Sequence, residues 1–354
     1  MGEKPDELEA AWGLPLIAVH CTDCGEAHLV PEDSIPSRCP LCLRESLTPQ
    51  SPPLRTEPPE QLLPYEISKR KLTDILAAWA RGVPLRPDDL KADVLTHRAQ
   101  CYFIPLWLVD GQLEGVWRAD VGFEYQTVSF QDLYKEGAGW NSQEVRERRI
   151  RWEPRVGRIC RQYQNLTVPA LMDYRSLMKQ LGGYELQKRA DYAPERVAGA
   201  LIRIPTVEPK AAWPDAETAF THAAEEECRQ AAGADYIRDF TLQAEYRNLN
   251  WTLLLLPAYI TWYREGEQFW PVLINGQNGQ VSGVRRASVR KAGTLSLVLG
   301  VAALLLFALG GILAFSGALV PPLLAAGGLL LILGLLVGIA APVPVLSAWA
   351  FNSR

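Results

Sequence analysis

The chain has 354 residues, of which 48% are hydrophobic and 21% charged, and its formal net charge is −4 at pH 7. This length suits two or three domains. The small net charge excludes a global basic field that would attract nucleic acid. The first residues, Met1–Glu9, are acidic and polar, so we expect no signal peptide and a body that stays in the cytosol.

Two CxxC pairs, Cys21/Cys24 and Cys39/Cys42, stand near the beginning of the chain with fourteen residues between them. This spacing is typical of a four-cysteine zinc ribbon, since each CxxC turn places two thiolates on one side of a knuckle. Four sulfur ligands leave no open position on the metal. We therefore predict one structural Zn²⁺, in a module that folds only with metal.

Two other interpretations of these cysteines are weaker. A redox CxxC pair needs a thioredoxin-like βαβ context, which the flanking sequence lacks. His20 and His28 are alternative nitrogen ligands that four cysteines make unnecessary, and both are predicted to lie on the surface. The remaining cysteines, Cys101 and Cys160 among them, are scattered as free thiols in a reducing compartment would be.

The ribbon is predicted to occupy residues 1–47, with short strands at Leu14–Val19 and His28–Val30. It carries little basic charge, which argues against a phosphate-binding surface. Residues 48–64 contain six prolines and should form a semi-extended linker that lets the ribbon move relative to the body.

The body, residues 65–284, mixes helix and strand signals. Ser68 can cap a helix that runs to Arg81 and ends at Gly82. Cys101–Val109 is rich in β-branched and aromatic residues, and Asp110-Gly111 predicts a turn before a return strand at Leu113–Gln126. Further along, the expected elements are helices at Pro169–Leu181 and Pro214–Ala232, strands at Val197–Val207, Tyr236–Leu249 and Trp251–Tyr263, and a hairpin of Phe269–Ile274 with Gln280–Val284. The predicted fold class is α+β with antiparallel sheets.

A basic stretch, Arg146–Arg161, has two interpretations. Its seven arginines could form a patch for anionic lipid or nucleic acid. Alternatively, they are the solvated face of a hairpin with Glu144, Glu147 and Glu153 as partners, which is the interpretation that we favour.

The chain ends in residues 285–354, which are strongly apolar. No charged residue lies between Lys291 and Arg354, and Pro321-Pro322 divides the stretch into spans Leu295–Phe315 and Leu323–Ala341. Each span is long enough to cross a bilayer, so residues 295–348 are predicted to lie in lipid as a helical hairpin. Basic residues gather outside the two spans and none lies between them, which places both ends of the hairpin in the cytoplasm.

Glycines recur along this hairpin, and Gly334 and Gly338 form a GxxxG motif. Such a motif allows close contact between the two helices of the hairpin or between two copies of the chain. A homo-oligomer is thus an open alternative.

The sequence contains no GxxxxGK[ST], GxGxxG, HExxH or GxSxG motif. Only four histidines occur, and none has a recognisable catalytic partner. Cys228 lies in a predicted amphipathic helix and is interpreted as a packed small residue. We expect neither catalytic residues nor a small-molecule cofactor, and hence no enzyme. A helicase in particular is not expected, because the sequence shows no nucleotide-binding loop.

Several ordered pieces of the chain resemble a bacterial family, the TFIIB-type zinc-ribbon membrane proteins. Besides the two CxxC knuckles, they are Leu62–Ser68, Leu85–Leu90, Phe103–Leu108, Leu255–Tyr259 and Ile274–Gly279. The second knuckle departs from the pattern, since Leu43 follows it instead of glycine. The resemblance implies a two-pass protein of the bacterial inner membrane, with partners such as phage-shock-protein-A-type or SPFH-type membrane scaffolds.

These observations favour a membrane-anchored adaptor that presents a cytosolic docking surface to protein partners. The first alternative is a membrane-tethered nucleic-acid-binding protein that uses the ribbon and Arg146–Arg161. The second is an enzyme whose sheet holds a small ligand in a deep pocket with converging polar groups.

Overall fold

The computed structural model describes residues 5–50, 58–135, 139–316 and 321–353. Within these ranges one mixed sheet forms the centre of the protein, and the predicted α+β class with mainly antiparallel pairing is confirmed. Its main path follows the order β11-β10-β9-β5-β8-β2-β1-β3. The bounds along this path are β11 Val281–Gly283, β10 Gln268–Asn275, β9 Tyr236–Glu265, β5 Gln100–Lys135, β8 Leu201–Arg203, β2 Ala27–Pro31, β1 Leu16–Cys21 and β3 Leu47–Pro49.

The remaining strands are attached at the sides of this path. Strand β6 (Gly139–Pro169) pairs with β5 from Leu106 outward, and β4 (Gln61–Leu62) lies between β9 and β7 (Ala190–Asp191). The same edge of β5 thus pairs with β8 near its beginning and with β6 over the rest of its length. Short helices complete the body: α1 Pro5–Trp12, α2 Lys69–Trp79, α3 Ala92–Arg98, α4 Tyr174–Leu181 and α5 Pro194–Val197.

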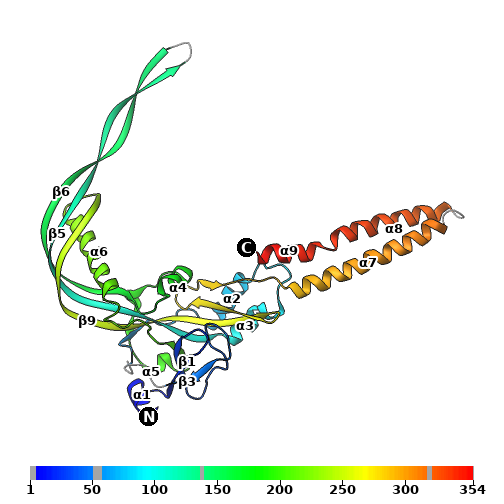
Figure 1. Ribbon diagram of the computed structural model, residues 1–354, viewed down its shortest axis with the longest axis horizontal. Helices are drawn as coiled ribbons and strands as arrows, with labels where there is room; N and C mark the ends of the chain where they lie inside the picture. Colours follow the sequence, from blue (N-terminus) through cyan, green and yellow to red (C-terminus); the bar gives the residue numbers. More distant parts are fainter. Residues whose placement is uncertain (1–4, 51–57, 136–138, 317–320, 354) are drawn as a thin grey trace.

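Three strands, β5, β6 and β9, continue far beyond the body as a curved blade, which we define as residues 112–135, 139–163 and 236–247 (Figure 1). Strand β9 begins at Tyr236 opposite Gly122, so the outer part of the blade is a two-stranded hairpin. Helix α6 (Trp213–Ala231) covers one face of its base. There Phe220, Ala224 and Cys228 are buried, which confirms that Cys228 is a packing residue.

The predicted turn at Asp110-Gly111 is wrong, because β5 passes through it as one continuous strand. The register shifts at this point, so the pair forms a β-bulge instead. A Cβ on Gly111 would lie 2.9 Å from the ring of Phe220, so glycine is needed here for the approach of α6. The predicted break near Asn250 in β9 is wrong for the same reason, since pairing with β5 continues across it.

Helix ends that were predicted from local signals agree better with the structure. Ser68 caps α2, its hydroxyl accepting a hydrogen bond from the backbone N–H of Lys71, and Gly82 follows with a φ of +80°. Helix α6 matches its predicted range within one residue. By contrast, α4 begins five residues later than predicted, and the strand at Val197–Val207 is reduced to β8.

The C-terminal stretch forms α7 (Val289–Ser316), α8 (Pro321–Ala340) and α9 (Val343–Asn352). Helices α7 and α8 lie side by side and project away from the body, and α9 returns to it (Figure 1). Two helical segments, Val289–Ser316 and Pro322–Asn352, are long and apolar enough to cross a membrane. The predicted loop between the spans, residues 316–320, lies almost wholly outside the described residues.

Small residues let α7 and α8 approach closely. A Cβ on Gly327 would lie 2.4 Å from the backbone nitrogen of Ala314, and one on Gly334 would lie 3.3 Å from the carbonyl oxygen of Ala303. The GxxxG motif thus faces α7 within the hairpin. Contact between two copies of the chain through this motif stays a prediction.

Candidate metal centre

The four predicted cysteines come together at the tips of two knuckles in the ribbon. In the first knuckle the N–H of Gly25 donates to the carbonyl oxygen of Cys21 (2.9 Å), and in the second the N–H of Leu43 donates in the same way to Cys39 (2.9 Å). Both donors have a positive φ, +75° for Gly25 and +61° for Leu43. The two knuckles therefore share one backbone geometry. Leu43 stands where the family pattern has glycine, and the turn is preserved, although a positive φ strains a leucine.

The sulfur positions fit a tetrahedral site. All four Sγ atoms lie within 4.8 Å of one another, with 3.5 Å between Cys21 and Cys42 and 3.6 Å between Cys24 and Cys39. A tetrahedron with Zn–S bonds of about 2.3 Å has edges of about 3.8 Å, so these sulfurs could bind one metal ion with little movement. No other donor is needed to complete the coordination.

The thiols differ in how readily they ionise. Burial opposes ionisation of Cys21, but hydrogen bonds from the Ser46 hydroxyl and from nearby backbone N–H groups outweigh it and lower its pKa to about 6. Burial raises the pKa of Cys24 to about 11 and that of Cys39 further. Four thiols this close together, two of them buried, cannot all ionise without a cation, and a bound metal ion supplies the positive charge that they need.

The two histidines of the ribbon differ in burial, and one of them is not at the surface as predicted. His20 is half-buried, whereas His28 is fully buried, so its predicted surface location is wrong. Its Nε2 lies 3.3 Å from the Tyr102 hydroxyl. Burial, assisted by the charge of Arg203, lowers the pKa of His28 to about 3, so this ring is neutral in the folded protein.

A buried arginine joins the first knuckle to the body. Arg203 on β8 is 2% exposed, and its guanidinium contacts Glu26 of the ribbon (2.7 Å) and Asp173 before α4 (2.9 Å). Strand β8 also pairs with β2 of the ribbon at His28 and Leu29. The ribbon is thus held in the main sheet, and the expectation that it moves on its linker is wrong in this structure.

The second knuckle has a contact of its own with the body. The guanidinium of Arg38 lies 4.2 Å from the centre of the Phe269 ring on β10, and it donates to the carbonyl oxygen of Leu43 (3.0 Å). Sequence reasoning missed Arg203 as an anchor of the ribbon. One signal could have revealed it, since a lone arginine in the apolar run Leu201–Ile204 is buried only when paired.

The basic stretch lies on β6, where its arginines divide between the two faces of the blade. Arg149, Arg151 and Arg155 on the face that α6 covers pair with Glu147 or Glu153, and Arg161 pairs with Glu227 of α6. For these four arginines the hairpin interpretation that we favoured agrees with the structure, with Glu147 and Glu153 as partners, whereas the third expected partner, Glu144, lies on the opposite face. On the opposite face, Arg146, Arg148 and Arg158 have no carboxylate partner among the described residues.

Comparisons with known proteins add no assignment: no family model, no curated protein and no solved structure matches the chain.

Proposed function

We propose that this chain is a membrane-anchored adaptor whose zinc-stabilised body presents the blade as a docking surface for another protein. The observation that carries the proposal is the outer face of the blade, the face opposite the one that α6 covers. It combines exposed apolar side chains with arginines that have no carboxylate partner among the described residues. Outside the apolar helices α7 to α9, no other described part of the chain exposes so many apolar side chains on one face.

The outer face follows from the strand register. Residues paired across β5 and β6 lie on the same face, and pairing is regular from Gly111 outward. Among the blade residues that the structure describes, five exposed aliphatic or phenylalanine side chains fall on this face: Val116, Val128, Phe130, Ile150 and Val156. Phe130 is 71% exposed. Val128 and Phe130 are neighbours near the outer end of this face, Val116 and Val156 are neighbours nearer its base, and Ile150 lies between the two pairs. Groups of exposed apolar side chains such as these are typical of an interaction site.

Charge on the same face is mixed. Arg146, Arg148 and Arg158 lie there together with carboxylates such as Glu124 and Glu144. Arginine is enriched in protein interfaces, where its planar guanidinium binds carboxylates, so these arginines support a protein partner. Phage-shock-protein-A-type or SPFH-type scaffolds are the partner classes that the sequence resemblance implies.

The C-terminal helices support the membrane anchor. Only 11% and 6% of the most apolar windows of the two candidate spans are buried in the protein, so their side chains need another apolar environment. Arg285, Arg286, Arg290 and Lys291 lie at the end of α7 that joins the body. By the positive-inside rule, these charges support a body on the cytoplasmic side of the membrane. The bacterial inner membrane is part of the proposal because the sequence resemblance implies it.

Zinc has a structural role in this proposal. Four thiolates around one ion would hold the ribbon in the shape that Arg203 and β8 bind. Nothing in the arrangement leaves a coordination position for substrate, in keeping with the proposal of a non-enzyme.

The test is affinity purification of the full-length protein from gently solubilised native membranes, with and without nuclease. A Val128→Ser/Phe130→Ser variant removes two outer-face side chains. Met172→Ser is the matched control, because Met172 is an 87% exposed side chain outside the blade. We expect a membrane scaffold to copurify with the wild type and the control, and to be lost with the double variant, whatever the nuclease treatment.

One result would refute the adaptor, and another would refute the blade as its docking surface. Recovery of nucleic-acid-binding proteins alone, lost on nuclease treatment, would support the nucleic-acid alternative. In that case the purified chain should bind DNA or RNA with a strong dependence on salt. Equal recovery of the scaffold with the double variant would show that the blade is not the docking surface.

A further inference from the structure

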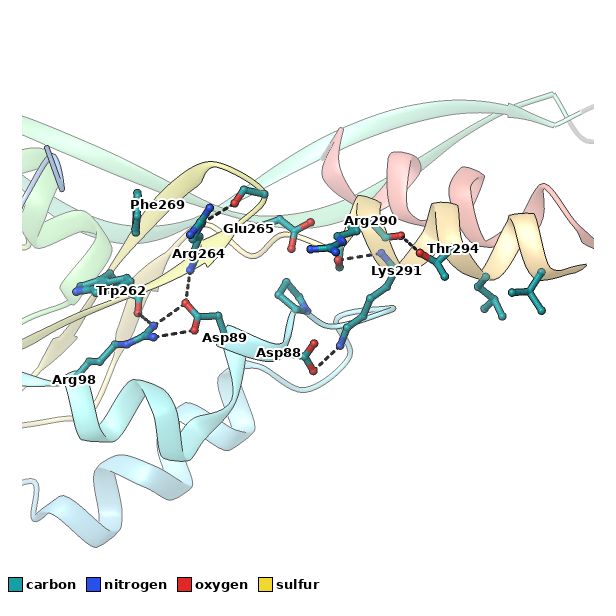
Figure 2. Close-up of a pocket in the computed structure, with 15 residues that line it drawn as sticks. Asp88, Asp89, Arg98, Trp262, Arg264, Glu265, Phe269, Arg290, Lys291 and Thr294 are labelled. Carbon is teal, nitrogen blue, oxygen red and sulfur yellow. Dashed lines mark hydrogen bonds and ion pairs between the residues drawn. The ribbon is translucent and has the colours of Figure 1, made fainter.

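A pocket of about 850 Å³ lies where the first apolar helix leaves the body, between α7, the β9–β10 turn and the segment before α3 (Figure 2). This volume falls in the range of small-molecule sites, about 300–1,000 Å³. If α7 enters a bilayer as proposed above, this is the depth at which phospholipid headgroups lie. The inference below therefore rests on the proposed membrane anchor.

The charged side chains on the wall of the pocket are only partly neutralised. Arg98 makes two hydrogen bonds to Asp89 (2.6 and 2.9 Å), and Lys291 pairs with Asp88 at 2.8 Å. These contacts, visible in Figure 2, satisfy both cations. The third carboxylate, that of Glu265, accepts a hydrogen bond from the backbone N–H of Val289 at the beginning of α7 (3.0 Å).

Two guanidinium groups of the pocket have no carboxylate partner among the described residues. Within the described part of the chain, the Arg264 side chain, from β9, donates to the carbonyl oxygen of Gly266 (2.8 Å) and to no other group, and the Arg290 side chain, from the first turn of α7, makes no hydrogen bond. Both side chains are exposed. Guanidinium groups bind phosphate through paired N–H donors, so these two are the groups of the pocket that are available to a phosphate.

The opposite part of the wall is apolar. Leu295 and Val298 of α7 are 41% and 58% exposed and continue the pocket toward the projecting helices. Trp262 and Phe269 line the body side, and aromatic rings are enriched at membrane interfaces. A ligand that fits this pocket has an anionic head and an apolar tail.

We infer that the pocket binds one anionic phospholipid, with its phosphate between Arg264 and Arg290 and its acyl chains along Leu295 and Val298. The apolar wall distinguishes this ligand from a free phosphate, which would use the guanidinium groups alone. Basic pockets beside membrane helices on the cytoplasmic side bind acidic headgroups in this way.

The test uses the full chain reconstituted in nanodiscs of phosphatidylcholine and phosphatidylglycerol at 3:1. Native mass spectrometry then counts the lipids that each chain retains. Arg264→Gln/Arg290→Gln removes both groups, and Arg290→Gln alone guards against misfolding of the double variant. Arg285→Gln is the matched control, since it removes one charge close to the membrane without lining the pocket.

We expect the wild type and Arg285→Gln to retain one phosphatidylglycerol in preference to phosphatidylcholine. The double variant should lose this preference at least tenfold, and Arg290→Gln should weaken it. Equal retention by all variants would overturn the site and indicate only annular lipid. Stabilisation of the detergent-solubilised protein by glycerol phosphate as strong as that by phosphatidylglycerol would also overturn it, in favour of a phosphate site.

Failure of the anchor is distinguishable from failure of the pocket. Alkaline carbonate extraction of native membranes shows whether the chain is integral. Extraction of the wild type would refute the anchor itself. An integral wild type without lipid preference would refute the pocket alone.

Discussion

Replacing Arg203 by methionine tests whether the ribbon is held to the body by one buried cation. Methionine keeps much of the length and apolar volume of the side chain but removes the charge. Arg203 is 2% exposed, and its loss would leave the carboxylates of Glu26 and Asp173 facing an apolar group. The cost should therefore come mainly from the unpaired carboxylates.

The magnitude follows from the burial of the three side chains. Removing one partner of a buried ion pair costs about 3–5 kcal/mol. The partners here regain some hydration, because the side chain of Glu26 is 22% exposed and that of Asp173 is 51% exposed. We therefore expect a loss near the lower limit, about 3 kcal/mol, out of a typical total of about 5–15 kcal/mol.

Arg175→Met is the matched control for this change. Arg175 pairs with Asp215 at 2.7 Å, a similar distance, but its side chain is 80% exposed. Exposed ion pairs contribute about 0.2–1 kcal/mol, so the control should lose less than about 1 kcal/mol. The two variants differ in burial, not in the kind of contact removed.

The assay is unfolding of the full-length protein in detergent with zinc at saturation, monitored by the fluorescence of its tryptophans. Arg203→Met should lower the free energy of unfolding of the body by about three times as much as the control, or more. Equal losses in the two variants would refute the reasoning. Unchanged stability of Arg203→Met would show that strand pairing and the contact of Arg38 with Phe269 hold the ribbon without this ion pair.

Three further predictions use other parts of the structure. His28 is neutral when folded, with a pKa of about 3 against 6.5 when unfolded. As pH falls below about 6.5, the unfolded chain therefore binds a proton at this residue that the folded protein does not, and the folded state loses stability. Between pH 7.5 and pH 5, His28→Gln should remove about 2 kcal/mol of acid destabilisation in denaturation curves, and curves parallel to the wild type would contradict this. Gly327→Leu should lower the melting temperature in detergent by several degrees, because a Cβ there would lie 2.4 Å from the backbone of α7, whereas Gly328→Leu has open space and should melt like the wild type. Metal analysis should find one zinc per chain in the wild type and in the Cys101→Ser control but none in Cys39→Ser, and equal zinc in all three would exclude the four-cysteine site.

Signals within a few residues of one another were sufficient for several features. The CxxC spacing predicted the sulfur cluster, because a CxxC turn is a local backbone structure. Ser68 predicted the beginning of α2, since a cap acts within one helical turn. The apolar C-terminal stretch predicted a pair of long helices. In each case the sequence contains the whole physical cause.

Features that depend on distant partners could not be predicted in this way. Asp110-Gly111 is a good turn signal, but β6 and β9 pair with β5 on both edges at this point and keep it extended. Both partners follow β5 in the chain, so no local window contains them. The blade was missed for this reason, as its strands were expected to be several shorter ones.

Burial of polar groups is the other property that local sequence could not supply. His28 was expected at the surface, yet pairing of β2 with β8 places it beside Tyr102 in the interior. Arg203 is buried because two carboxylates, one 177 residues before it, meet at its guanidinium. A sequence indicates that such a group needs partners, but only the fold supplies them.

The continuity of β5 has a consequence for the proposed adaptor. Its first residues follow Arg98 of the membrane-proximal pocket, Tyr102 and Phe103 pair with β8 beside the ribbon, and its outer half forms the blade. One strand therefore connects the proposed anchor, the ribbon and the docking surface, with pairing on both edges over much of its length. A flexible linker would allow a bound partner to move freely relative to the bilayer. A paired strand holds the partner at a set position and angle instead, which suits a protein that positions a scaffold at the membrane surface.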